Sequence, residues 1–366
     1  MLKNYLLTAL RTFRKERFYM IINVGGLMLS FFSCLVLCLY IRDEFSYDDF
    51  HEHKDHIYRI FEENSGRQFA VTPYPWAESL VEEFSEIEDI ARVLPISAIF
   101  QVDDQLFSEP RGIVADTSFF NVFSFPLVSG DAATALTSPN TVLITPALAE
   151  KYFGTIEVLD QMIEINLFGD AESFAVAGVI EPPAQSQLQF DFVLPYERVI
   201  ANNPNPHAFE NWSVHFLYSY VLANQPLDPA DMKVRLKEFL DRHHGDWLSA
   251  KYNPQVEPLS SIYLHSNKEF ELPVRGSFTD LLILAAVALS ILVIGLINYI
   301  NLTTARAFSR LRGASVRRVY GATKWHITQQ HLVESSLLVG LSMLLAALSV
   351  QVLHQPLSEI SGKDFS

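Results

Sequence analysis

The residues best suited to chemistry in this sequence form a short basic segment near its end. Residues 301–333 carry six Lys and Arg side chains and no Asp or Glu, and Val316, Val319, Trp325 and Ile327 place apolar groups among them. Guanidinium groups bind carboxylates and phosphates through paired hydrogen bonds, and apolar side chains stabilise a contact by leaving water. This combination predicts either a docking element for a cytoplasmic partner or a basic loop held at an anionic membrane surface.

Patterns that assemble an enzyme site are missing from the sequence. It contains no GxxxxGK[ST] phosphate loop, no HExxH, no CxxC and no GxSxG pattern. His51, His53 and His56 form a cluster, but no further His or Cys at a suitable spacing completes a metal site, so we favour a solvated helix face. Cys34 and Cys38 lie in an apolar run, where we expect membrane packing. We therefore predict that this chain is not an enzyme and binds no metal or cofactor itself.

Three uncharged apolar runs predict three transmembrane helices. They cover Phe18–Ile41, Leu281–Ile300 and Ser335–Leu353. A helix over the first run is about 36 Å long, enough to cross a hydrocarbon core of about 30 Å. The first run is too long for a signal peptide and has no small-residue cleavage site before Arg42. Because the runs hold no Asp, Glu, Lys, Arg or His, they argue against a secondary transporter or a substrate-lined pore.

The charged residues indicate how the chain is oriented. Residues 1–17 and 304–333 are basic, whereas residues 42–277 carry 15 basic and 37 acidic side chains. The positive-inside rule places the two basic segments in the cytoplasm and the long acidic segment outside. The formal net charge of −15 argues against a nucleic-acid partner.

The predicted division of the chain alternates cytoplasmic, membrane and outer segments. It consists of a cytoplasmic amphipathic N-terminal helix (1–17), transmembrane helix 1 (18–41), a periplasmic domain (42–277), transmembrane helix 2 (278–303), a cytoplasmic coupling loop (304–333), transmembrane helix 3 (334–353) and an extracytoplasmic tail (354–366).

The outer domain has the pattern of an α+β fold. A strand, a helix and a short strand are predicted at 56–62, 77–84 and 91–94, and the same order returns at 216–223, 229–244 and 253–258. Two such strand–helix–strand units can share one sheet. The segment between them, about 95–210, is rich in short strands and turns and predicts an inserted β-rich subdomain. The predicted fold class is therefore a membrane protein with three transmembrane α-helices and a large α+β extracytoplasmic domain.

Several motifs resemble those of a known family. Residues 315–323, SVRRVYGAT, are similar to the G-[IV]-R-[KR]-x-x-G-A motif of FtsX-like permeases, the MacB-type or type VII permeases of ABC transporters. Further similar segments, in the same order as in the family, are Asn301-Leu302 and Glu334-Ser335 in the membrane part, and 47–51, 57–59, 119–131, 145–154 and 178–183 in a MacB-like periplasmic core domain. The resemblance covers nearly the whole chain.

The resemblance implies a division of labour between subunits. A separate cytoplasmic ATPase subunit would bind ATP and Mg and dock near residues 306–331, and its ATP-driven dimerisation would move the spans and the outer domain by mechanotransmission. The docking role would fall to Arg310, Arg312, Val316, Arg317, Arg318, Gly321, Ala322, Lys324 and Trp325. Other implied partners are a second permease copy or a related permease half, membrane lipid and periplasmic proteins. The implied location is the bacterial inner membrane, and the implied process is export or release of an envelope substrate.

Two departures from the family pattern modify these expectations. Glu and Gly usually precede the motif, where this chain has Gly313 and Ser315, which predicts a weaker ion pair to the ATPase. The family also has a fourth span, so we expect this chain to be a fragment or a truncated, inactive permease. The alternative from another class is a membrane-anchored periplasmic scaffold or binding protein without transport activity.

Overall fold

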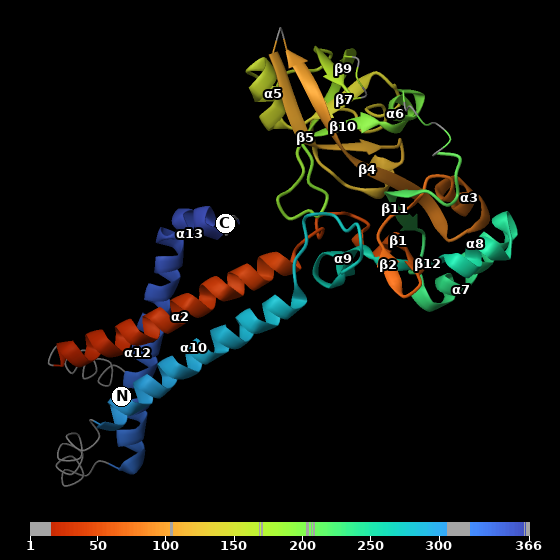
Figure 1. Ribbon diagram of the computed structural model, residues 1–366. Helices are drawn as coiled ribbons and strands as arrows, with labels where there is room; N and C mark the ends of the chain where they lie inside the picture. Colours follow the sequence, from red (N-terminus) through yellow and green to blue (C-terminus); the bar gives the residue numbers. More distant parts are fainter. Residues whose placement is uncertain are drawn as a thin grey trace. The chain divides into compact units, whose positions relative to one another are not determined.

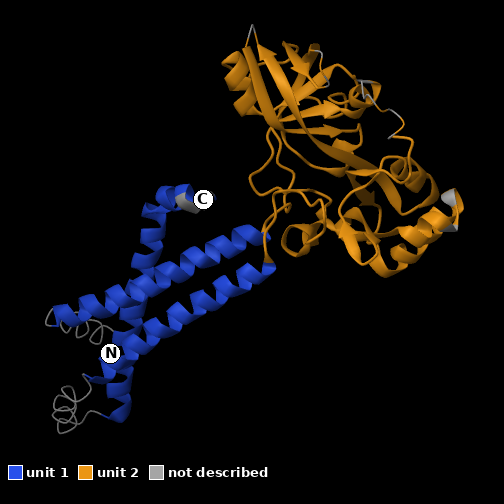
Figure 2. Ribbon diagram, in the orientation of Figure 1, with its two compact units in different colours: residues 1–45, 278–366 blue, residues 46–277 orange. Residues whose placement is uncertain are grey.

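The structure is a computed structural model, which describes residues 16–102, 105–167, 169, 171–202, 205, 207, 209–305, 323–361 and 363 (Figure 1). The chain forms two compact units (Figure 2). One comprises residues up to Phe45 together with those from Phe278 onward, and the other is Ser46–Ser277. The predicted N-terminal helix over 1–17 lies almost wholly outside the described residues, and so does most of the predicted coupling loop.

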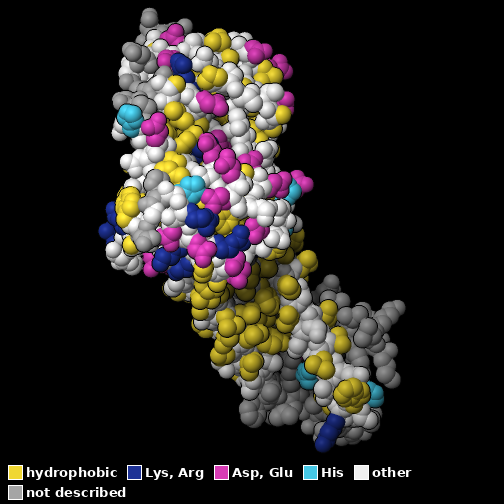
Figure 3. Space-filling view, turned by 90° about the vertical axis from the view of Figure 1, so that its right-hand side faces the viewer, with side chains coloured by type: hydrophobic (Ala, Val, Ile, Leu, Met, Phe, Trp, Pro, Cys, Tyr) yellow, Lys and Arg dark blue, Asp and Glu magenta, His cyan; other side chains and the backbone are white. Residues whose placement is uncertain are grey.

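The membrane unit is built from long apolar helices. Within the described residues, three helices are long and apolar enough to cross a membrane, namely α2 (Arg17–Phe45), α10 (Phe278–Ala305) and α12 (Lys324–Val352). A short helix, α13 (His354–Ser361), follows them. Figure 3 shows hydrophobic side chains covering this unit, whereas charged side chains are scattered over the other one.

All three helices extend beyond the predicted apolar runs. α2 continues through Arg42 to Phe45, and α12 begins at Lys324, so the last part of the predicted coupling loop, 324–333, is helical and continuous with the third span. No Gly or Pro interrupts the chain between Lys324 and Gly340. Thr323 caps the start of α12, because its side chain accepts a hydrogen bond from the His326 amide (3.4 Å).

α2 packs antiparallel against α10 through small and polar residues (Figure 1). The Tyr19 hydroxyl lies 3.0 Å from the Thr303 hydroxyl. Farther along the pair, a Cβ added at Gly295 would lie 2.2 Å from Ser30 Oγ, so the two backbones approach closely at this point. Such small-residue contacts are a common way for helices to associate in lipid.

α12 also packs against α2, which makes α2 the shared partner of the other two spans. The buried residues of α12 recur at every fourth position and therefore share one face. They are Glu334, Leu338, Ser342 and Ala346.

The chain beyond α13 is attached to the C-terminal end of α2. Lys363 Nζ lies 2.6 Å from Asp43 Oδ2 and 2.5 Å from Glu44 Oε1, and it is 4.6 Å from the centroid of the Tyr40 ring. Asp43 and Glu44 are both largely buried side chains, so this cluster ties the predicted tail segment to α2.

The second unit is a 12-stranded sheet covered by helices. Its strands are β1 (Ile57–Asn64), β2 (Arg67–Phe69), β3 (Thr72–Pro73), β4 (Ile87–Val102), β5 (Gln105–Ala115), β6 (Leu127–Gly130), β7 (Thr141–Ile144), β8 (Met162–Asn166), β9 (Ala171–Ile180), β10 (Phe192–Pro195), β11 (His215–Ala223) and β12 (Asn253–Pro258). Its helices are η1 (Lys54–His56), α3 (Trp76–Glu83), α4 (Phe119–Val122), α5 (Pro146–Phe153), α6 (Tyr196–Asn202), α7 (Pro229–His244), α8 (Asp246–Lys251) and α9 (Leu259–His265).

The two predicted strand–helix–strand units are confirmed, and their strands interleave. The order β12–β1–β11–β4 is antiparallel throughout and takes its strands from both units. Helices α3 and α7 cover one face, where Trp76, Leu80, Met232 and Phe239 meet β1 residues such as Ile60. Helices α4 and α9 contribute to the core on the other face. β1 is therefore covered on both sides, which explains its unbroken run of buried residues from Ile57 to Glu62.

The predicted β-rich insertion is also confirmed, but its first strand is a continuation of β4, which also belongs to the main sheet. The strand expected at 91–94 runs from Ile87 to Val102, and an irregularity in register between Ile96 and Ala98 lets it continue into the insertion. The strand order then continues β5–β10–β7–β9–β6, with β8 pairing to β4 and β9. A second core around Phe100, Phe174 and Phe192 fills this lobe.

Replacing Gly295 by Leu tests the α2–α10 contact. We expect Gly295→Leu to destabilise the helix pair by about 1–3 kcal/mol, because the new side chain occupies the space of Ser30. The measurement is the thermal unfolding midpoint of the purified full chain in detergent, followed by the helical circular dichroism signal.

The matched control is Gly340→Leu in α12, where an added Cβ meets no atom within 4 Å. We expect this control to unfold like the wild type. Equal unfolding midpoints for the two variants would contradict the close packing of α2 on α10.

Candidate coupling site

The structure describes only two of the predicted docking residues. Lys324 and Trp325 form the first turn of α12, both are exposed, and Trp325 keeps 64% of its surface accessible. The other seven lie outside the described residues. They are Arg310, Arg312, Val316, Arg317, Arg318, Gly321 and Ala322. The docking role of this segment therefore stays a prediction.

Two short connectors join the outer domain to the membrane helices. The first, Ser46–Phe50, follows α2, and the second, Ser266–Ser277, leads into α10. Each is attached to the rest of the domain by buried charged or polar side chains. The connectors form the candidate coupling site, because they are the segments through which the chain of the domain continues into α2 and α10.

Asp48 anchors the first connector. It is 3% exposed, and its φ of +60° is a left-handed conformation that Asp tolerates better than most residues. Its Oδ1 accepts hydrogen bonds from Ser186 Oγ (3.2 Å) and the Gln187 amide (3.1 Å), and its own amide donates to the Gln185 carbonyl (2.8 Å). Burial raises the pKa of Asp48 to about 6, although the hydrogen bonds from Gln187 and Ser186 act in the opposite direction.

His51 corrects the prediction of a solvated histidine cluster. Its side chain is buried between Phe123 and Phe125, with ring centroids 5.2 Å away in both cases. The Ser124 amide donates to Nδ1 (3.1 Å), so Nε2 carries the proton of the neutral ring, and Nε2 lies 4.0 Å from Asp48 Oδ1. Burial lowers the pKa of His51 to about 4. The prediction was wrong because the rings that bury His51 come from a distant part of the sequence.

The other two histidines lie elsewhere. His53 is exposed, and His56 is half-buried with Nδ1 3.1 Å from the Ala223 carbonyl oxygen. Both line an open surface hollow of about 650 Å³ together with Glu88 and Asp89. In the part of the chain that the structure describes, no three His, Cys, Asp or Glu residues are placed to hold a metal ion.

Arg59 anchors the second connector to the sheet. It lies on β1 and is fully buried. Its Nη2 donates to Glu257 Oε1 on β12 (2.7 Å), to Ser266 Oγ (3.0 Å) and to Glu271 Oε2 (2.7 Å), while Nη1 bonds the other oxygen of Glu271. Ser266 and Glu271 both belong to the connector, so one guanidinium group holds it against two strands.

Charge is balanced within this cluster. Lys268 Nζ donates to Glu257 Oε2 (2.5 Å), so two cations face two carboxylates in a nearly dry environment. Burial raises the pKa of Glu271, but the hydrogen bond and charge of Arg59 outweigh it and the net pKa is lowered. The Arg59 guanidinium is held charged, because its carboxylate partners raise its pKa further despite burial. Breaking such a cluster leaves a buried charge without compensation.

Sequence reasoning did not single out Asp48, His51 or Arg59 as site residues. All three lie in the segments 47–51 and 57–59, which carry part of the family resemblance. One signal was available in the sequence, because Arg59 stands inside the apolar strand IYRIF, and a cation in a strand covered on both faces requires buried partners.

Comparison with known proteins identifies two matching family models. The MacB-like periplasmic core domain matches residues 20–239, which is more than half of the chain, and the FtsX-like permease C-terminal domain matches residues 285–365. No curated protein matches the chain.

Solved structures similar to the chain include domains of three proteins. A domain of a protein described as a permease from Porphyromonas gingivalis is 20% identical, with a TM-score of 0.48 over 57% of this chain and 92% of that one. The periplasmic region of MacB from Actinobacillus actinomycetemcomitans is 16% identical, with a TM-score of 0.41 over 57% and 90%. The extracellular domain of the noncanonic ABC-type transporter YknZ from Gram-positive bacteria is 13% identical, with a TM-score of 0.41 over 55% and 99%.

Replacing Arg59 tests the buried cluster. We expect Arg59→Met to destabilise the domain by about 3–5 kcal/mol, because Glu271 stays buried without its cationic partner and Glu257 keeps only Lys268. Thermal unfolding of the full chain in detergent, followed by tryptophan fluorescence, measures the effect.

Arg67→Met is the matched control, since Arg67 pairs with Glu269 on the surface and its side chain is 65% exposed. An exposed pair contributes about 0–1 kcal/mol. If both variants lose the same stability, the Arg59 cluster does not hold the connector.

Asp48→Asn tests the buried carboxylate through its pH dependence. A pKa of about 6 in the folded chain, against 3.8 normally, means that the ionised carboxylate destabilises the fold at pH above 6 and that protonation relieves this as the pH falls. Asn keeps the acceptor and tolerates the left-handed backbone. We therefore expect Asp48→Asn to be more stable than the wild type by up to about 3 kcal/mol at neutral pH.

The extra stability of Asp48→Asn should shrink as the pH falls from 6 towards 4. The difference between the unfolding midpoints of the variant and the wild type measures it at each pH. Because His51 is present in both proteins and stays neutral down to a pH of about 4, it does not contribute to that difference. A pH-independent difference would show that Asp48 is not a buried carboxylate of raised pKa.

Proposed function

Because the chain belongs to the family of MacB-type, FtsX-like permeases, we propose that it couples ATP hydrolysis by a separate subunit to movement of its own extracytoplasmic domain. It is an ABC-transporter-type permease, that is, a membrane component and not the catalytic subunit. The family implies a partner ATPase, which would bind ATP and Mg. The observation that carries the proposal is the anchoring of both connectors by buried groups.

The proposed path begins at the cytoplasmic ends of the helices. A P-loop ATPase docks on the segment around Arg317 and Arg318, and its closure on ATP displaces the N-terminal end of α12. α12 packs on α2, and α2 packs on α10, so a displacement of one helix changes the position of all three. The acidic outer domain and the basic segments favour an arrangement with the N-terminus in the cytoplasm and Ser46–Ser277 in the periplasm.

The proposed path ends in the sheet of the outer domain. α2 continues directly into the connector that Asp48 holds, and α10 is continuous with the connector that Arg59 holds. A flexible linker would absorb helix movement, whereas the Arg59 anchor would pass it to β1 and β12 and the Asp48 anchor to the segment around Ser186. The inserted lobe then moves with β4, because that strand belongs to both parts of the sheet. A second permease copy and periplasmic proteins complete the proposed assembly, which exports or releases an envelope substrate at the bacterial inner membrane.

Charge reversal of the basic segment tests the docking step. We expect Arg317→Glu combined with Arg318→Glu to abolish co-purification of the ATPase and its stimulated ATP hydrolysis, because two guanidinium groups that would bind its carboxylates are lost. The matched control reverses two exposed lysines of the outer domain, Lys237→Glu with Lys251→Glu, which changes the net charge equally.

The two parts of the proposal fail in different ways. If the double arginine variant retains both the ATPase and its stimulation, the docking residues are wrong although the coupling stands. If the wild-type chain, purified from its own membranes, brings no P-loop ATPase with it, the proposed coupling itself is wrong and a scaffold role takes its place.

A further inference from the structure

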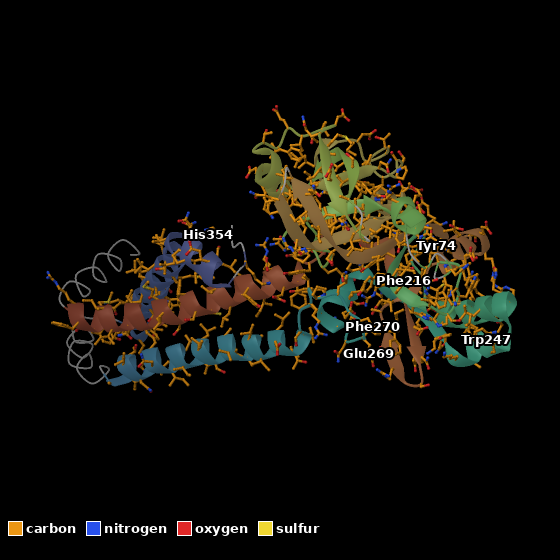
Figure 4. All side chains as sticks on the ribbon, turned by 45° about the horizontal axis from the view of Figure 1, so that its top comes forward. Tyr74, Phe216, Trp247, Glu269, Phe270 and His354 are labelled. Atoms are coloured by element: carbon orange, nitrogen blue, oxygen red, sulfur yellow. The ribbon has the colours of Figure 1, made fainter. Side chains whose placement is uncertain are left out.

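Phe270 displays its ring on the surface in a backbone conformation that bulky residues rarely adopt. Its φ is +58°, and 68% of the residue is exposed. A bulky residue keeps a left-handed backbone only where the surrounding structure enforces it. Because such strained residues cluster at functional sites, Phe270 is a candidate for a function. Figure 4 shows Phe270 next to Glu269 at the surface of the domain, apart from Trp247, another exposed aromatic residue.

Hydrogen bonds hold the backbone on both sides of this ring. The Ala70 amide donates to the Glu269 carbonyl (3.0 Å), and the Glu269 amide donates to the Gln68 carbonyl (2.8 Å). The Tyr218 hydroxyl donates to the carbonyl oxygen of Phe270 itself (2.6 Å). The exposed ring is therefore presented by a fixed backbone and not by a loose loop.

The neighbours of Phe270 form a small surface of mixed character. Its ring stacks on that of Phe69, with centroids 6.2 Å apart, and the Arg67 guanidinium lies 5.4 Å from the Phe69 ring centroid. Arg67 also pairs with Glu269. Aromatic rings beside a long basic side chain are typical of surfaces that meet the boundary between lipid and water.

The chain itself indicates which partner this surface meets. The Gly276 amide donates to the Tyr263 carbonyl (2.9 Å), so the chain stays attached to the domain until two residues before α10 begins at Phe278. The uncharged run of α10 starts at Leu281. From Phe270 to Phe278 the chain spans at most about 28 Å. The headgroup layer adds about 5–7 Å beyond the hydrocarbon core, so lipid headgroups lie within reach of Phe270.

We propose that Phe270 inserts into the headgroup region of the membrane that α10 crosses, with the ring of Phe69 packed between it and the core of the domain. The contact fixes this side of the outer domain to the lipid surface. The inference rests on the local structure and on the chain length to α10, and it does not depend on ATPase coupling.

Quenching of tryptophan fluorescence by brominated lipid tests the contact. The full chain carrying Phe270→Trp is reconstituted in phosphatidylcholine vesicles whose acyl chains are brominated near the glycerol end, and in the same lipid without bromine. The emission of the wild type is subtracted, because it has four tryptophans of its own. Leu106→Trp is the matched control, since Leu106 is 67% exposed and lies on β5 in the inserted lobe.

We expect the added emission of Phe270→Trp to be blue-shifted and mostly lost in brominated lipid, and that of Leu106→Trp to be unaffected. Emission of Phe270→Trp that bromine leaves unchanged, or equal quenching of the two variants, overturns the proposal. If Phe270→Trp unfolds in detergent at a lower temperature than the wild type, Arg67→Trp takes its place in the same comparison, because the Arg67 side chain is 65% exposed beside the Phe69 ring, and the same outcomes decide it.

Discussion

The fully buried guanidinium group of Arg59 is the interaction on which the attachment of the outer domain depends. It binds β12 through Glu257 and the segment leading to α10 through Ser266 and Glu271. Separating these groups would expose charges to an interior that solvates them poorly, so the cluster resists being pulled apart. Hydrophobic contacts are less directional and allow sliding. A charged cluster at the point where a membrane helix joins the domain therefore favours movement of the connector and sheet as one body.

The membrane unit follows a different principle. Its helices associate where small residues allow close approach, as at Gly295 and Ser30, and where hydroxyl groups meet, as at Tyr19 and Thr303. Hydrophobic burial does little to hold helices together in lipid, because the lipid tails are as apolar as the side chains. Close packing and hydrogen bonds between the helices must therefore hold them together. α2 contacts both α10 and α12, so it connects the second span with the third.

Much of the fold was predictable from local patterns. The helix at 229–244 agrees in both bounds, because Asp228 caps it, Pro229 occupies its first turn and Gly245 follows it. β4 was predicted too short, because the irregularity after Ile96 interrupts the alternation of apolar and polar residues that reveals a strand.

The anchors of the coupling site could not be predicted in the same way. Asp48 contacts residues near position 186, and Arg59 contacts residues near 257 and 271, so their burial is a product of tertiary packing that no local pattern records. The family resemblance placed Asp48 and Arg59 in matching segments without showing their role. The predicted docking residues mostly lie outside the described part of the chain and stay predictions.

The interleaved order β12–β1–β11–β4 has a consequence for how such a domain can diversify. The inserted lobe leaves the sheet along β4 and returns along β11, and these strands are paired, with Val93 opposite Tyr218. The two ends of the insertion are therefore only one strand spacing apart, about 4.8 Å. A lobe of another size or surface fits between the same two strands without displacing β1 or β12, provided that it keeps the segments around Ser124 and Ser186, which hold the first connector and the adjoining His51. Evolution can thus change the remainder of the lobe while the strands that lead to the membrane helices stay unchanged.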